Sequence, residues 1–101
     1  MKDRMLILRE GYPVGTLLQA EFGYVVGLNK PQNTATDGHE KGYSGNSGDQ
    51  LMVLGYFSVQ QGPKLVNYQG LKVWNLTENK VVWLYWSQLM LHFRKPYEHH
   101  E

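Results

Sequence analysis

The chain has 101 residues, of which ten are Lys or Arg and nine are Asp or Glu, so its formal charge is +1, and it contains no cysteine. This length suits one domain and is too short for two independent cores. The missing cysteines exclude a disulfide framework, a thiolate zinc site and a cysteine nucleophile, and the near-neutral charge lacks the basic excess typical of nucleic-acid-binding proteins.

No segment reads as a membrane helix. The longest apolar runs, Leu51–Phe57 and Val81–Trp86, are far shorter than the roughly 20 residues that such a helix needs. The N-terminal MKDRMLILRE has an apolar stretch too short for a signal peptide. We therefore expect no membrane association and a cytoplasmic location.

The apolar residues come in short blocks rich in Val, Tyr, Trp and Leu, separated by Gly, Asn, Pro and Asp, without a helical period. This spacing is typical of strands and turns. In chain order the blocks are Met5–Leu8, Gly15–Ala20, Gly23–Asn29, Gln50–Phe57, Leu71–Leu76, Val81–Trp86 and Leu89–Phe93. The sequence predicts one all-β domain over residues 1–95 and a flexible tail over 96–101.

The stretch 30–49 differs in kind from these blocks. It contains one clear hydrophobe, Tyr43, among many Gly, Ser, Thr, Asn and Asp residues. Such a segment buries too little apolar area to offset the entropy of ordering it. We predict one long mobile loop here, which a partner could order.

The clearest local signal is a β-hairpin. Leu71–Leu76 and Val81–Trp86 have high β-propensity and flank Thr77–Lys80, in which Asn79 suits a positive φ. After it, the polar pair at the start of Ser87–Met90 breaks the pattern. We expect a single 3₁₀ turn there, before a closing strand.

The order of the blocks is similar to that of small SH3-like barrels. KVW at 72–74, KVVWL at 80–84 and SQL at 87–89 resemble the C-terminal half of small SH3-like proteins encoded by tailed bacteriophages. The turn here is Thr-Glu-Asn instead of the Asp-Gly of that pattern, and the 30–49 loop is longer. The resemblance implies a small five-stranded SH3-like barrel and a viral source, in host cytoplasm or virion, and it carries no catalytic residue.

Two groups of residues have the side chains of a catalytic or metal-binding site. Asp37-Gly38-His39-Glu40 places carboxylates around an imidazole, and His99-His100 lies between glutamates at the C-terminal end. A general acid or base needs a rigid scaffold, and a metal site needs second-shell support. A Gly-flanked loop and a terminal tail supply neither, so we expect no enzymatic activity, no cofactor and no metal.

The aromatic content, 13% of the chain, is high. Val81, Trp83 and Tyr85 alternate with Val82, Leu84 and Trp86, so both faces of this strand are apolar. A small core cannot absorb all of these side chains. Either the N-terminal segment and loops of this chain cover the outer face, or another protein does.

The candidate partner-binding residues are the aromatic ones of the hairpin and the central strand: Trp74, Trp83, Tyr85, Trp86 and Tyr56. Trp and Tyr are frequent anchors of protein interfaces. Our first hypothesis is a non-enzymatic interaction or structural module of phage or viral origin that binds a protein partner or a second copy of itself. The alternative is a nucleic-acid-binding barrel that stacks bases on Tyr24, Tyr56 or Tyr68.

Overall fold

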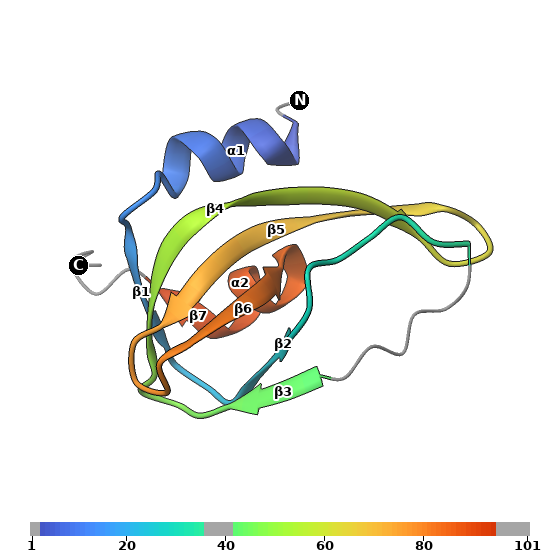
Figure 1. The fold of residues 1–101 in the computed structure, drawn as a ribbon. Helices are drawn as coiled ribbons and strands as arrows, with labels where there is room; N and C mark the ends of the chain where they lie inside the picture. The colour runs from blue at the N-terminus through green and yellow to red at the C-terminus, as the bar shows by residue number, and fades with distance from the viewer. Residues whose placement is uncertain (1–2, 36–41, 95–101) are drawn as a thin grey trace.

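The computed structural model describes residues 3–35 and 42–94, and in these residues seven strands form one antiparallel sheet (Figure 1). In chain order the elements are α1 (Arg4–Gly11), β1 (Leu17–Ala20), β2 (Tyr24–Gly27), β3 (Gly42–Gly45), β4 (Gln50–Gln61), β5 (Val66–Asn75), β6 (Lys80–Tyr85), α2 (Trp86–His92) and β7 (Phe93–Arg94). The strands are ordered β3-β2-β6-β5-β4-β1-β7.

The prediction of a mainly β chain is confirmed, but the five-stranded SH3-like barrel is not. The sheet of the described residues has seven strands and two ends, β3 and β7, so it is not closed. The two additional strands are short and lack alternating hydrophobes, because β3 reads GYSG and β7 has two residues. Period-two patterning therefore could not reveal them.

The sheet is curled around its core. The register between β4 and β5 shifts between Val53 and Gly55, and such a bulge bends a strand and increases its twist. Tyr24 of β2 and Phe93 of β7 come from opposite sides of the strand order, yet their ring centroids are 4.7 Å apart. The curl thus brings distant strands together across the core without closing the sheet.

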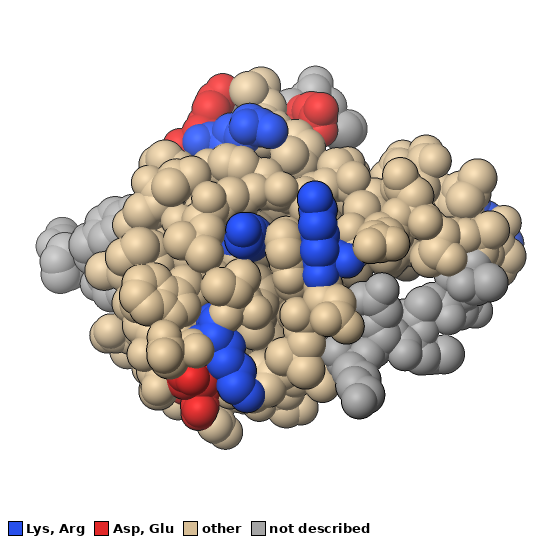
Figure 2. Space-filling view, viewed as in Figure 1, with Lys and Arg blue, Asp and Glu red and all other residues tan. Residues whose placement is uncertain are grey.

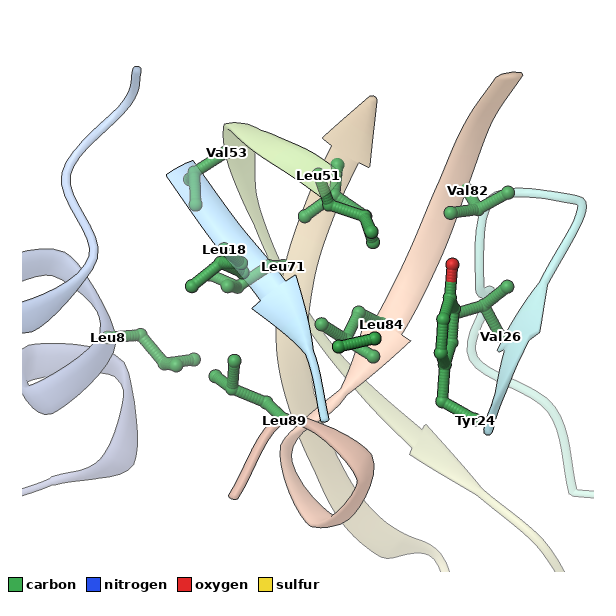
Figure 3. Packing of buried hydrophobic residues seen from close by; sticks show 12 residues of the cluster. Leu8, Leu18, Tyr24, Val26, Leu51, Val53, Leu71, Val82, Leu84 and Leu89 are labelled. Carbon is green, nitrogen blue, oxygen red and sulfur yellow. The ribbon is translucent and has the colours of Figure 1, made fainter. Parts of the chain in front are cut away.

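The core lies inside this curl and is completed by the two helices. Leu8 of α1 and Leu89 of α2 point toward the strand residues in Figure 3. The cluster consists of Leu8, Leu18, Ala20, Tyr24, Val26, Leu51, Val53, Leu71, Val73, Val82, Leu84 and Leu89, all of them at most 2% exposed. The helices therefore replace the missing closure of the sheet as cover for its inner face.

Helix α1 was not expected, because its residues were read as an apolar block without a period. The carboxylate of Asp3 accepts a hydrogen bond from the Met5 N–H at 3.0 Å and caps the helix. Leu8 is the buried residue of this helix. A helix with one buried residue has too weak an amphipathic pattern to be recognised in the sequence.

Helix α2 stands where the sequence predicted a 3₁₀ turn followed by a strand over Leu89–Phe93. The helix runs through Trp86–His92 and leaves only Phe93–Arg94 as a strand. Its buried residue, Leu89, belongs to the core cluster. None of the described helices is long and apolar enough to span a membrane.

The β5–β6 hairpin is confirmed, and Asn79 has the expected positive φ of 56°. Strands β4 and β5 are longer than their apolar blocks, and they meet at a turn over 62–65 in which Leu65 has a φ of 49°. The outer ends of β4 and β5 extend past the end of β6, which pairs with β5 only as far as Gly70. We call this extension, residues 58–69, the arm.

The range 30–49, predicted as one mobile loop, contains ordered structure. Its first part, together with Leu28 and Asn29, forms a segment that runs from β2 to the outer end of β4, and we call residues 28–35 the strap (Figure 1). The Thr34 N–H donates to the Gln60 carbonyl, and the Gly62 N–H donates to the Thr34 carbonyl, both at 3.0 Å. Gly42–Gly45 forms β3, Asp49 is buried, and residues 36–41 lie outside the described part.

Candidate interaction surface

The register of the central strands defines an outer face, directed away from the core cluster. Met52 of β4 pairs with Trp74 of β5, which pairs with Val81 of β6. In an antiparallel sheet, residues directly opposite each other share a face. These three side chains therefore form one apolar row across three strands, which we call the open patch.

A second row lies further along the same face. Phe57 of β4 is opposite Gly70 of β5, which is opposite Tyr85 of β6. An added Cβ on Gly70 would clash with the Phe57 ring and with the Leu84 carbonyl oxygen. Phe57 and Tyr85 pack edge to face over this glycine, with centroids 5.0 Å apart.

The middle of the outer face is covered. Phe57, Val59 and Trp83 form a second buried cluster, each at most 8% exposed. The strap lies next to this cluster, since it bonds to Gln60 and Gly62, and its Pro31 is buried. Part of the aromatic excess is therefore absorbed by the chain itself.

Within the described part of the chain, the open patch is exposed. Trp74 is 38% exposed and Val81 is 45% exposed. The Trp74 Nε1–H donates to the Asn79 Oδ1 at 3.2 Å, which fixes the orientation of the exposed indole against the hairpin turn. A large aromatic ring that is exposed and held in one orientation loses little entropy when a partner binds it.

Two of the five candidate residues lie elsewhere. Tyr56 is opposite Leu71 and therefore faces the core side, where its hydroxyl donates to the Tyr12 carbonyl at 2.7 Å. Trp86 begins α2 and also packs against the core. Helix α1 contacts both rings, with Arg9 4.8 Å from Tyr56 and Arg4 5.2 Å from Trp86. Trp74, Trp83 and Tyr85 share the outer face, while Tyr56 and Trp86 belong to the junction with α1.

Lysines lie among the aromatic residues of the strands. The Lys72 Nζ is 5.7 Å from the Trp83 ring, and the Lys80 Nζ is 4.6 Å from the Tyr43 ring. Figure 2, which looks onto β5 and β6, shows Lys and Arg side chains across the middle of a mostly uncharged face and acidic side chains at its margin. The Lys72–Trp83 pair belongs to this outer face, whereas Lys80, opposite Asn75, and Tyr43, opposite Val26, lie on the inner side of the sheet.

A buried polar network holds the hairpin base to β2. Tyr24 donates its hydroxyl to the Asp49 Oδ2 at 2.8 Å, and the Asn75 amide donates to the Tyr24 hydroxyl at the same distance. The Asn46 N–H donates to the same carboxylate oxygen at 3.0 Å. Burial, and then the hydrogen bond to Asp49, hold the pKa of Tyr24 well above its ordinary value.

Sequence reasoning missed this network, because Asp49 was placed in a mobile loop. Its three side chains come from positions 24, 49 and 75, which no local spacing links. The side chain of Asn75 also accepts a bond from the Glu78 N–H at 3.0 Å. The network thus positions the turn that carries Asn79, and through it the Trp74 ring.

The tyrosines considered for stacking bases have different environments. Tyr24 is buried in the network, Tyr56 packs under α1, and Tyr68 is 40% exposed on the arm. Of these three, Tyr68 alone presents an exposed ring. It contacts Tyr85 edge to face at 5.8 Å.

The groups considered for catalysis or metal binding, Asp37–Glu40 and His99–His100, lie outside the described residues. Within 3–35 and 42–94, no three His, Cys, Asp or Glu side chains are placed to hold a metal ion together.

A hollow of about 270 Å³ lies between β1, β7 and the β3–β4 turn and is lined by Gln19, Ala20, Glu21, Ser47, Gly48 and Arg94. Its Arg94 approaches Glu21 at 3.9 Å.

Comparison of this chain with protein-family models, curated proteins and solved structures finds no match.

Proposed function

We propose that this protein is a non-enzymatic interaction module that binds a protein partner through the open patch of Met52, Trp74 and Val81. The observation that carries the proposal is the exposed Trp74 ring, which a hydrogen bond to Asn79 holds in place. Interfaces take most of their binding energy from a few such anchors, Trp above all. Two apolar neighbours from the flanking strands make the surface contiguous.

The resemblance of segment 72–89 to phage-encoded SH3-like proteins supports a further part of this proposal, the biological process in which the protein acts. It implies an SH3-like relationship and a structural or assembly role in a virus, in host cytoplasm or virion. The genes that flank the coding sequence test this part. A position among virion-assembly genes supports it, and a position among cellular housekeeping genes contradicts it.

The test of the binding surface uses a photo-crosslinking amino acid in place of Leu17, an exposed residue opposite Met52 that leaves Trp74 intact, in the natural host, to identify the protein that it contacts. The purified partner is then titrated against the unmodified chain, Trp74→Ala and the control Leu91→Ala, which removes an exposed side chain on α2. We expect Trp74→Ala to weaken binding at least about tenfold, the effect of a typical anchor. Equal binding by all three proteins would contradict the proposal.

A single-stranded nucleic acid is the second candidate partner. The observation in its favour is the Lys72 ammonium group beside the aromatic residues of the outer face, because stacking on aromatic rings beside cations is how such strands are held. The net charge of +1 argues against it. Fluorescence titration of the chain with a single-stranded oligonucleotide at low salt tests this candidate. Binding by the unmodified chain that is lost in both Trp74→Ala and Lys72→Ala would favour it.

A further inference from the structure

The arm has an unpaired strand edge. Strand β5 pairs with β4 along its whole length, Val66–Asn75, but it pairs with β6 only over Gly70–Asn75. Among the described residues, the 66–69 part of β5 therefore has a strand on one side only. Val66, Asn67 and Tyr68 are all exposed.

The backbone of Asn67 points to the free side. On β4, the Gln60 N–H donates to the Asn33 side chain and the Gln60 carbonyl accepts from Thr34, so both groups point toward the strap. Gln60 is opposite Asn67. In an antiparallel strand pair, the N–H and C=O of one residue point to the same side of the strand. Where two opposite residues are not hydrogen-bonded to each other, the N–H and C=O of both residues point away from the partner strand. The Asn67 N–H and C=O are thus directed away from β4.

This edge lacks the usual protection. Natural edge strands carry charges, prolines or bulges that discourage pairing with another chain. Here the Pro63-Lys64 pair precedes the edge, but 66–69 reads VNYQ, with no charge and no proline. Two of its side chains, Val66 at 46% and Tyr68 at 40%, are exposed apolar groups on the outer face.

We propose that this edge pairs with the same edge of a second copy of the chain, antiparallel and about a two-fold axis at Asn67. The edge is self-complementary, because an antiparallel strand pair has a two-fold axis of its own. The pairing places the backbone of Asn67 against its symmetry mate, where two N–H···O=C bonds can form. It also sets Val66 of each copy beside Tyr68 of the other, as apolar cross-strand pairs.

The absence of charge on residues 66–69 favours a second copy of the chain as the partner of this edge. Since 66–69 is uncharged, two copies meet there without repulsion. Four residues are a short edge, so we expect a weak dimer that forms in the upper part of the accessible concentration range. This surface is separate from the open patch, and the proposal holds or fails independently of the proposed function.

The experiment is sedimentation equilibrium of the full chain from micromolar to millimolar concentration, with variants at Asn67. We expect a monomer–dimer equilibrium that the uncharged control Asn67→Thr retains. Asn67→Lys, which sets two like charges face to face on the axis, should raise the dissociation constant by about tenfold or more. Mixing Asn67→Lys with Asn67→Glu should restore association, because only the mixed pair has opposite charges.

A strict monomer at millimolar concentration overturns the proposal. A dimer that Asn67→Lys leaves intact overturns it as well, because the interface is then elsewhere. Circular dichroism establishes that the variants fold. Should they not fold, amide exchange in the unmodified chain decides: the Asn67 amide must become more protected as concentration rises, and unchanged protection overturns the proposal.

Discussion

At the scale of single residues, the Tyr24–Asp49–Asn75 network joins three polar side chains that are buried in the described structure. Asp49 is 4% exposed and accepts bonds from a hydroxyl and a backbone amide at 2.8 and 3.0 Å. Buried polar groups are stable only while their partners are present. The loss of one member therefore affects the others.

We expect Asp49→Ala to lower the free energy of unfolding by about 1–3 kcal/mol, because the Tyr24 hydroxyl and the Asn46 amide lose their acceptor. Urea denaturation followed by tryptophan fluorescence measures this. A double-mutant cycle with Tyr24→Phe should give a non-additive sum, since both changes break the same bond. Simple additivity would contradict the coupling.

The same network predicts sensitivity to alkali. Because burial raises the pKa of Tyr24 in the folded chain, the unfolded chain loses this proton first as the pH rises through about 10. The folded state then binds more protons than the unfolded state, so the free energy of unfolding falls with increasing pH. Tyr24→Phe should flatten this alkaline slope, and equal slopes for both proteins would rule out the assignment to Tyr24.

At the scale of the elements, the central hairpins depend on a glycine beneath aromatic rings. Gly70 lets the Phe57 ring and the Leu84 carbonyl approach the β5 backbone. Gly55 lies on the same outer face, opposite Lys72, and an added Cβ there meets nothing nearer than the Lys72 Cβ at 3.9 Å. The two glycines therefore form a matched pair for testing the packing.

We expect Gly70→Ala to destabilise the chain by about 1–3 kcal/mol through overpacking. Gly55→Ala should be neutral or stabilising by up to about 1 kcal/mol, because it restricts the unfolded chain without a clash. Thermal unfolding of both variants gives the comparison. If the two substitutions had the same effect, the close packing at Gly70 would not matter for stability.

Helix α1 supplies a second matched pair. Leu8 is fully buried in the core cluster, and Leu6, two residues away, is 44% exposed. Leu8→Ala should cost about 2–5 kcal/mol, as core truncations do, while surface changes such as Leu6→Ala stay within about 0.5 kcal/mol. Chemical denaturation measures both, and similar losses would mean that α1 does not cover the core in solution.

The limits of sequence reasoning differ from element to element. The β5–β6 hairpin was predictable, because β-propensity and the turn residue Asn79 agree locally. Helix α1 was not, since a single buried leucine gives no period. Strand β3 was hidden by its glycines, one of which, Gly45, is needed because the Tyr24 ring packs against its backbone.

For the candidate surface, the pattern indicated correctly that both faces of β6 are apolar. It could not say that Trp83 is buried while Trp74 stays exposed, because the burial of Trp83 involves neighbours from other strands, such as Phe57 of β4. Nor could it separate Tyr56 from the hairpin aromatics. The bulge between Val53 and Gly55 reverses the alternation along β4, and this places Tyr56 on the inner side.

At the scale of the whole molecule, the topology joins distant parts of the chain. Strand β1, near the N-terminal end, lies between β4 and β7, and β2 pairs with β6. Such non-local pairing requires long loops to close before contacts form.

We expect folding within milliseconds to seconds, as for other sheets with non-local contacts. Stopped-flow tryptophan fluorescence can follow it, since Trp83 becomes buried on folding. Microsecond folding would show that the strand order plays little part in the rate-limiting step.

The outer face is bivalent. It carries two exposed aromatic side chains, Trp74 and Tyr68, and the buried cluster of Phe57, Val59 and Trp83 lies on the same face. A ligand that touches only one exposed ring gains the affinity of a single weak contact, whereas a ligand long enough to reach both gains a second contact at high effective concentration. Binding strength should therefore depend on the span of the ligand more steeply than on its composition.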